Sequence, residues 1–383
     1  MPSSPTGLLS RYFDRGSPLG AEDLPSLRQA LSSVPDPRAR RGVRYPFTEV
    51  LLVFVAAVLS GARSLTMITE WAARAQGQRM IFGCGRSPSL ATIHRIATLV
   101  DPVALDTALA AWTTARTTGP GRGLAAVAVD GKEVRGAKRA GGDRVFLMAA
   151  LTHHQATVVA QEAIGVKTNE IPHLPILLDR LGNLDGVVIT ADALHTIAAQ
   201  ATAIVARGGH YLFTVKTNQS GLRNRIGSQG WSHRTTGYLL REKAHGRTST
   251  WEATVALAPA RIDFPHAAQT IRLLRGRAEH GSGEKTGEQV FAITSLPPHL
   301  AGARELAQLL RGHWAIENRL HWVRDTAYRE DASQVRTGHG PHVMASIRNL
   351  ALNIVRLAGH TNITATLRAL DHHPEIVRQL TGL

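Results

Sequence analysis

The stretches LAAVAVD (residues 124–130) and GVVITAD (residues 186–192) decide the fold class, because each is a short apolar run that ends in an aspartate. Such runs are typical of buried strands. Three more strands are predicted nearby, at VFLMAALTHH (145–154), ATVVAQEAIG (156–165) and YLFTVK (211–216). Helical patterns precede and follow GVVITAD. The resulting order of three adjacent strands, helix, strand, helix, strand predicts an α/β core built on one mixed sheet.

The regions on either side of this core have a different periodicity. From about residue 21 to 118, apolar side chains recur at helical spacing, and TTGPGRG (117–123) has the composition of a linker. Residues 218–302 are polar and glycine-rich with strand-like pieces, and helical patterns return after them. We therefore expect an all-helical N-terminal region at 1–118, the first part of the core at 124–217, a β-containing insertion at 218–302, returning core helices at 303–358 and a C-terminal tail at 359–383.

The charge balance favours a polyanionic partner. Lys plus Arg number 44 against 29 Asp plus Glu, a formal charge of +15, and cationic side chains that neutralise phosphates release counterions. The alternative is an arginine-rich composition without a binding role. Cys84 is the sole cysteine, which excludes an intramolecular disulfide and a cysteine-based zinc cluster.

Two features of the sequence bear on its location. The first residues lack the apolar segment of a signal peptide. The most apolar run, VLLVFVAAVL (50–59), is too short to span a bilayer and is better interpreted as a buried helix. We therefore expect a cytoplasmic protein with no membrane partner.

Three carboxylates are the candidate catalytic and metal-binding residues. Asp130 and Asp192 each stand where an apolar strand runs into a loop, a rigid position at the rim of a sheet. Either one alone could instead cap a turn. Glu317 lies in HWAIENRLHW, a predicted amphipathic helix whose apolar side includes Trp314, Leu310 and Leu320, and these neighbours argue against a casual surface position. Competitors for the third acid are Asp325, Glu330 and Asp331.

Carboxylates in this number suit divalent metal ions. Phosphodiester cleavage needs charge stabilisation at the attacking and leaving oxygens, which two Mg²⁺ ions held by Asp130, Asp192 and Glu317 can supply, and Mn²⁺ suits the same ligands. A zinc site made by His313, Glu317 and His321 is the alternative. On a regular helix, side chains four residues apart are rotated by about 40°, so His313 and His321 would point about 80° apart. The three side chains would therefore not easily bind one ion.

Several cations are candidate DNA contacts. Lys132 follows Asp130, Lys216 ends a strand, and Arg324 stands two helical turns after Glu317. The loop VPDPRARRGVRYP concentrates four arginines, and Ser89 is placed to cap a short helix from which Arg95 projects. Each of these side chains could also be a plain surface cation. The loop residues are Arg38, Arg40, Arg41 and Arg44.

At these residues the sequence resembles the H-repeat-associated (ISAs1-type) insertion-sequence transposases, within the wider IS4-like DDE transposases. Ten elements match in order and span about residues 25–357: VPDPRARRGVRYP, LSGARSLTMITEWA, SPSLATIHRI, VAVDGKEVRG, VKTNEIP, TADALHT, YLFTVKTNQ, ITSL, RGHWAIENRLHWVRD and REDASQVRTG. The resemblance implies a ribonuclease-H-like core and assigns the catalytic acids to Asp130, Asp192 and Glu317. It also implies a Tyr-Arg-Glu-Lys signature, whose other positions here hold Leu310, His313 and Arg324. Ile197 stands where relatives often have glutamine.

The resemblance implies a transposase that cleaves DNA and transfers strands at the ends of an insertion sequence, with Mg²⁺ or Mn²⁺ as cofactor. Its expected partners are the terminal inverted repeats and target DNA, bound by a homodimer in the nucleoid. His313, at the signature's arginine position, becomes a further candidate DNA contact. Two alternatives remain open: an inactive DNA-binding protein derived from a transposase, and a metal-dependent nuclease without strand transfer.

Overall fold

The chain is described by a computed structural model that covers residues 25–41, 43–74, 86–117, 124–137, 144–165, 170–231, 236–244, 246–280 and 285–381. Cys84 and most of the predicted linker lie outside these residues. The fold divides into two compact units. Unit 1 comprises residues 1–119, 131–173 and 317–383, and unit 2 comprises residues 120–130 and 174–316. The chain therefore passes from one unit to the other directly after Asp130 and directly before Glu317.

Unit 1 is mainly helical. Its described helices are α2 (Leu27–Ser32), α3 (Phe47–Leu59), α4 (Leu65–Ala73), α6 (Leu90–Leu99), α7 (Pro102–Arg116), α12 (Trp322–Ala327), α13 (Gly340–Leu357), α14 (Ile363–His372) and α15 (Pro374–Thr381). The first five confirm the predicted helical N-terminal region. The last two occupy the stretch from which we expected only a tail.

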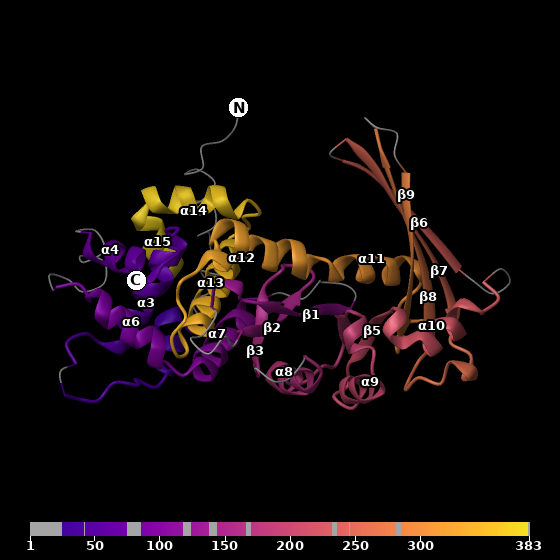
Figure 1. Cartoon of the computed structure of the whole chain (residues 1–383), viewed down its shortest axis with the longest axis horizontal. Helices are drawn as coiled ribbons and strands as arrows, with labels where there is room; N and C mark the ends of the chain where they lie inside the picture. Colours follow the sequence, from indigo (N-terminus) through magenta and orange to yellow (C-terminus); the bar gives the residue numbers. More distant parts are fainter. Residues whose placement is uncertain are drawn as a thin grey trace. The chain divides into compact units, whose positions relative to one another are not determined.

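Helix α13 forms the centre of unit 1. It is buried along nearly its whole length and packs against α3, α6 and α7 (Figure 1). Helix α3 is apolar on all sides and is buried from Val50 to Leu59, as predicted for this run. The N-terminal helices and α13 therefore share one hydrophobic core, although more than 200 residues separate them in the sequence.

The same unit contains the hairpin of β2 (Phe146–Thr152) and β3 (Val158–Ile164), which pair antiparallel as predicted. Strand β1 (Ala125–Glu133) belongs to both units, since its first six residues lie in unit 2 and its last three in unit 1. A small cluster made by Val134, Ala137, Val145, Leu147 and Ala345 joins the end of β1 and the start of β2 to α13.

Unit 2 carries the parallel part of the sheet. Strands β1 and β4 (Val187–Ala191) pair parallel, and β4 pairs parallel with β5 (His210–Val215). Helices α8 (Leu174–Leu181) and α9 (Ala198–Val205) precede and follow β4, and both lie on one face of these strands, whereas α11 (Ala303–His313) crosses the other (Figure 1). The predicted order of strands and helices is confirmed.

The predicted insertion extends this sheet. It contains α10 (Ser220–Gly227) and four long strands, of which three were predicted; the strands are β6 (Thr236–Ala244), β7 (Arg247–Leu257), β8 (Gln269–Glu279) and β9 (Lys285–Thr294). Strand β9 pairs antiparallel with β5, which gives the strand order β3-β2-β1-β4-β5-β9-β8-β7-β6. Apolar residues of β8, β9 and α11 pack with Val188 and Leu212 in one cluster.

The first five strands in this order, with an antiparallel start and parallel β4 and β5, form the ribonuclease-H-like core that we expected. The fold class of a mixed α/β sheet is thus confirmed. Among the described residues, no single helix has the length and apolar composition of a membrane span; α6 and α7, which bend by 87° at their junction, pass that test only as a pair.

Candidate active site

Asp130 and Asp192 stand at equivalent places on neighbouring strands. In the parallel register of β1 and β4, Val129 pairs with Ala191; Asp130 is the next residue of β1, which continues to Glu133, whereas Asp192 is the first residue after β4. Both side chains are half-buried. The prediction that each aspartate ends its strand therefore holds for Asp192 only, and the register places the two residues at the same level of adjacent strands within unit 2.

One oxygen of Asp192 has a structural role. Its Oδ1 accepts a hydrogen bond of 2.8 Å from the backbone N–H of Leu194 and so caps the short helix at Ala193–His195. This is the capping role that the sequence allowed for either strand-end acid. It fixes the orientation of the carboxylate while Oδ2 can still accept a cation.

Glu317 does not lie in a regular α-helix. Helix α11 ends at His313, and Ile316–His321 form one π-helical turn before α12 begins. A π turn inserts an extra residue and shifts the helical phase of the residues after it. Ile316 and Leu320 are fully buried, whereas Trp314 is 53% exposed and the Glu317 side chain is 62% exposed. Our expectation that indole rings shelter Glu317 was therefore wrong, because Trp314, at the end of α11, is itself exposed.

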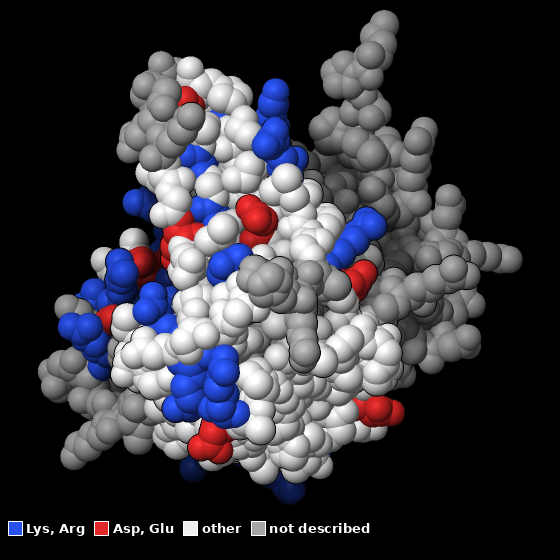
Figure 2. All heavy atoms as spheres, turned by 90° about the vertical axis from the view of Figure 1, so that its right-hand side faces the viewer, with Lys and Arg blue, Asp and Glu red and all other residues white. Residues whose placement is uncertain are grey.

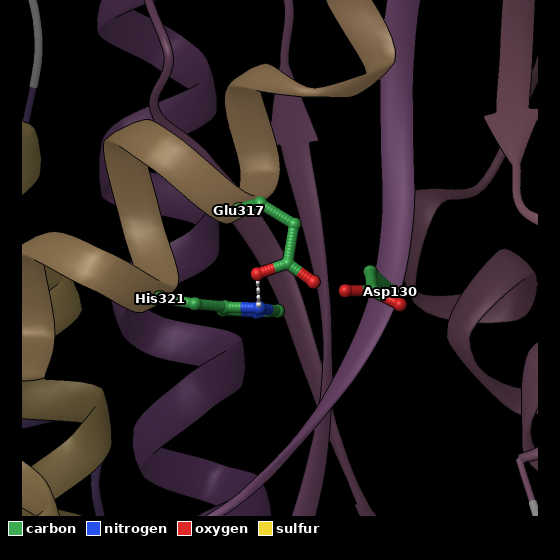
Figure 3. A group of neighbouring side chains, drawn as sticks. All are labelled: Asp130, Glu317 and His321. Carbon is green, nitrogen blue, oxygen red and sulfur yellow. Dashed lines mark ion pairs between the residues drawn. The ribbon is translucent and has the colours of Figure 1, made fainter. Parts of the chain in front are cut away.

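His321 is the partner of Glu317 within unit 1. Its Nδ1 lies 3.5 Å from Glu317 Oε2, an ion pair drawn in Figure 3 together with Asp130 on β1. Burial lowers the pKa of His321, an effect that Glu317 opposes and Arg324 and Lys132 reinforce. The neutral ring can then donate a hydrogen bond to the carboxylate or offer nitrogen to a metal ion. The sequence suggested His321 only as a zinc ligand, although its four-residue spacing from Glu317 is the signal for this contact.

Two of the competing acids bind Lys132 instead of standing free for metal. Lys132 Nζ lies 2.7 Å from Asp325 Oδ2 and 3.3 Å from Asp331 Oδ1, and its side chain is only 10% exposed. Burial raises the pKa of Asp325, and the cation of Lys132 opposes that shift. These two ion pairs connect Lys132, near the end of β1, to the segment after Glu317.

The third competitor, Glu330, is buried between two arginines. Its carboxylate accepts from Arg324 Nε at 2.8 Å and from Arg348 Nη1 at 3.0 Å, and none of the three side chains is more than 1% exposed. Burial acts to raise the pKa of Glu330, but the two guanidinium groups outweigh it and lower the pKa to about 2. Arg324, which we predicted to contact DNA, is therefore enclosed in the core of unit 1.

The remaining predicted cations differ in exposure. Lys216 is exposed directly after β5, and the Nδ1 atom of His313 lies 3.2 Å from Thr190 Oγ1 within unit 2. Arg38 is held by Asp36 and by the carbonyl of Tyr45, and 5% of its side chain is exposed. The other predicted arginines are exposed on unit 1; they are Arg40, Arg41, Arg44 and Arg95.

Comparison with known proteins gives two matching family models. A model described as transposase DDE domain matches residues 112–354, and a model described as DDE_Tnp_1-associated matches residues 28–113. Among curated relatives, "Putative transposase YncI" of Escherichia coli O157:H7 is 28% identical over 86% of this chain and 87% of its own length. The "H repeat-associated putative transposase YhhI" of Escherichia coli K12 is 27% identical over 87% of this chain and 91% of its own length.

A search of solved structures finds the piggyBac transposase in a synaptic complex with hairpin DNA. The match has a TM-score of 0.41 and 9% identity and covers 98% of this chain and 81% of that one. This likeness is remote, and the strand order and the family models stand independently of it.

Proposed function

Because the chain belongs to the transposase DDE-domain family, we propose that it cleaves phosphodiester bonds at the ends of an insertion sequence and joins the freed ends to target DNA. The observation that carries this proposal is the pair of aspartates, Asp130 and Asp192, which follow paired positions on adjacent parallel strands inside the matched region. With Glu317, also inside that region, they form the proposed catalytic set.

The donor atoms of this set fit a hard divalent cation. Carboxylate oxygens are the ligands that Mg²⁺ and Mn²⁺ prefer, and Asp130, Asp192 and Glu317 each offer them. His321 adds a nitrogen beside Glu317 (Figure 3). When bound, such ions stabilise charge on the attacking and leaving oxygens of an in-line displacement. The enclosed Glu330, in contrast, has both oxygens committed to arginines and does not fit this role.

The protein's own residues contribute to the reaction by holding the carboxylates in position. The hydrogen bond from the backbone N–H of Leu194 fixes the orientation of the Asp192 carboxylate. The contact with His321 restrains the Glu317 side chain, which is otherwise exposed. Cleavage breaks the bond between phosphorus and the 3′-oxygen as water attacks in line. The freed 3′-hydroxyl then attacks a phosphorus of the target DNA, and the target strand's own 3′-oxygen leaves with the proton as a hydroxyl. Both steps are phosphoryl transfers, for which orientation and charge neutralisation supply most of the catalysis.

DNA would be held by basic side chains. The exposed cations Lys216, Arg40, Arg41, Arg44 and Arg95 are the proposed contacts, with His313 as a further candidate. Figure 2 shows one face on which Lys and Arg gather in separate patches, with Asp and Glu scattered among them. We also propose that two copies bring two element ends together. Lys132 and Arg324 are proposed to support the site and not to bind phosphate, because carboxylates already engage them.

A cleavage assay tests the proposal. Purified protein is incubated with a labelled duplex of its own element end, with and without Mg²⁺, beside Asp192→Asn and Glu317→Gln. Glu375→Gln is the matched control, because Glu375 on α15 is similarly exposed and its Oε1 atom lies 3.0 Å from Nδ1 of His373. We expect metal-dependent cleavage by the wild type and the control and none by the two site variants.

Products of the same assay separate the alternatives. Joined products with added target DNA identify a transposase, whereas cut ends without joining identify a nuclease. Binding of the end by the wild type with no cleavage under Mg²⁺ or Mn²⁺ would replace the enzyme with an inactive DNA-binding derivative.

A further inference from the structure

Helix α6 has one buried face and one face exposed to solvent. Ile93, Ile96, Ala97 and Val100 are fully buried at the spacing of one helical stripe. The opposite stripe includes exposed Ala91, His94 and Arg95, and Ser89 caps the helix by accepting from the backbone N–H of Thr92. The helix thus presents a short side chain, an imidazole and a guanidinium together on a surface that no described residue covers.

The arginine loop, defined as residues Arg38 to Arg44, is attached to the beginning of α6. The buried side chain of Arg38 restrains this loop. Its guanidinium group makes a bidentate pair with Asp36 and lies 5.7 Å from the ring centre of Phe47. The Tyr45 hydroxyl then donates a hydrogen bond of 2.9 Å to the carbonyl of Ser87, two residues before the cap. This hydrogen bond joins the residue after Arg44 to the residue after Arg86, and the side chains of Arg40, Arg41, Arg44 and Arg86 are exposed.

The far end of α6 is fixed to the part of the chain that precedes α13. The backbone N–H of His339 donates to the carbonyl of Thr98 at 3.1 Å, and its Nδ1 atom lies 2.9 Å from the carbonyl oxygen of Val100. The chain is therefore anchored within unit 1 both just before α6 and at its end, and Ala91, His94 and Arg95 lie exposed between these two points. Helices that read DNA commonly do so with their N-terminal residues, from a rigid mount.

We propose that α6 enters the major groove of the element end and reads base edges through Arg95, with His94 beside it, while Arg40, Arg41 and Arg44 contact the flanking phosphates. An exposed arginine on a helix suits guanine, because its guanidinium group can donate to O6 and N7 together. Arginines on a loop neutralise phosphates without regard to sequence. This inference rests on the proposed function, and it divides the predicted cations into sequence-reading and sequence-independent contacts.

Equilibrium binding of the full chain tests this division without requiring catalysis. Fluorescence anisotropy measures the affinity for a duplex of the protein's own element end and for a shuffled duplex of equal composition, at several salt concentrations without divalent metal. For Arg95→Ala we expect the preference for the true end to fall by about 10- to 100-fold with little change in affinity for the shuffled duplex. For Arg41→Ala we expect both affinities to fall together, with a salt slope shallower by about 1.

Arg368→Ala, which removes an exposed arginine of α14, is the control and should change neither quantity. Matching circular dichroism spectra and melting temperatures show that each variant is folded. If Arg95→Ala keeps the full preference, or if it lowers both affinities equally, α6 does not read sequence and the inference is overturned. Neither result depends on cleavage, which the separate assay measures. Failure of this inference can therefore be distinguished from failure of the proposed catalytic function.

Discussion

At the scale of single residues, the most constrained group is the buried carboxylate of Glu330. It is fully enclosed with Arg324 and Arg348, and Asn349 lies 3.4 Å from Arg324 Nη1. Removing Arg348 leaves Glu330 paired with Arg324 but takes away the donor to its Oε1 atom, and an unsatisfied buried acceptor costs about 1–3 kcal/mol. We expect Arg348→Met to lower the free energy of unfolding in urea by that amount, with the exposed Arg368→Met as control. A variant as stable as the wild type would show that the buried charges are solvated or neutral.

The same carboxylate gives a pH dependence with a definite sign. The pKa of Glu330 is about 2 in the folded chain against an ordinary value of 4.5, so the unfolded chain takes up the proton first as the pH falls. Its contribution to stability is therefore complete above pH 4.5 and is lost as the pH falls from about 4.5 to about 2. We expect the difference in unfolding free energy between the wild type and Glu330→Gln to shrink across that range. A difference that stays constant down to pH 2 contradicts this assignment.

Lys132 offers a residue-scale test between two roles. The sequence predicted a phosphate contact, whereas the Nζ atom of Lys132 is bound by Asp325 and Asp331. If Lys132 supports the site, Lys132→Met should reduce cleavage at least about tenfold, since small displacements of catalytic groups are costly, and leave end binding unchanged. A loss of DNA affinity with a salt slope shallower by about 1 would instead restore the phosphate contact. Lys216→Met, at an exposed site, is the comparison.

At the scale of elements, periodicity predicted most of the fold. The strands β1 to β5 and the helices α3, α4, α6 and α7 all lie where short apolar runs or helical spacing placed them. The π turn at Ile316–His321 was not predicted, because a single extra residue leaves the average helical pattern intact. Strand β6 was also missed, since the apolar Leu239 is exposed between the partly buried Tyr238 and Leu240, which leaves no alternation of apolar and polar residues.

The π turn itself makes an element-scale prediction. Deleting the exposed Asn318 removes the extra residue and should turn Ile316–His321 into regular α-helix, which changes the spacing of Glu317 and His321 from four residues to three. We expect metal-dependent cleavage to be lost while the far-UV circular dichroism spectrum stays helical. Asn318→Ala keeps the turn length and should retain cleavage. Full activity of the deletion variant would show that the π geometry is dispensable.

At the scale of the whole molecule, the sequence predicted the proposed catalytic carboxylates more readily than the buried ion pairs that surround them. Asp130 and Asp192 could be predicted because an apolar run of the sequence ends in each of them, and Glu317 because its surrounding motif resembles a known family. Lys132 contacts Asp325, which lies 193 residues further along the chain, and Arg324 contacts Glu330 across the turn that follows α12. Neither contact leaves a periodic signal in the sequence, so Lys132 and Arg324 were predicted to contact DNA.

The matched N-terminal region, residues 28–113, belongs to the same compact unit as α13. Asp106 accepts hydrogen bonds from Ser346 at 2.5 Å and pairs with His342 at 2.6 Å, and Asn353 donates to Thr113 at 3.1 Å. A fragment of residues 25–117 would lose α13, expose the apolar face of α7 and leave Asp106 without these partners. We therefore expect it to bind the dye ANS, to lack near-ultraviolet circular dichroism and to melt without a cooperative transition, unlike the full chain. A cooperative transition with well-dispersed amide resonances would contradict this expectation and would make the helical region a separable DNA-binding module.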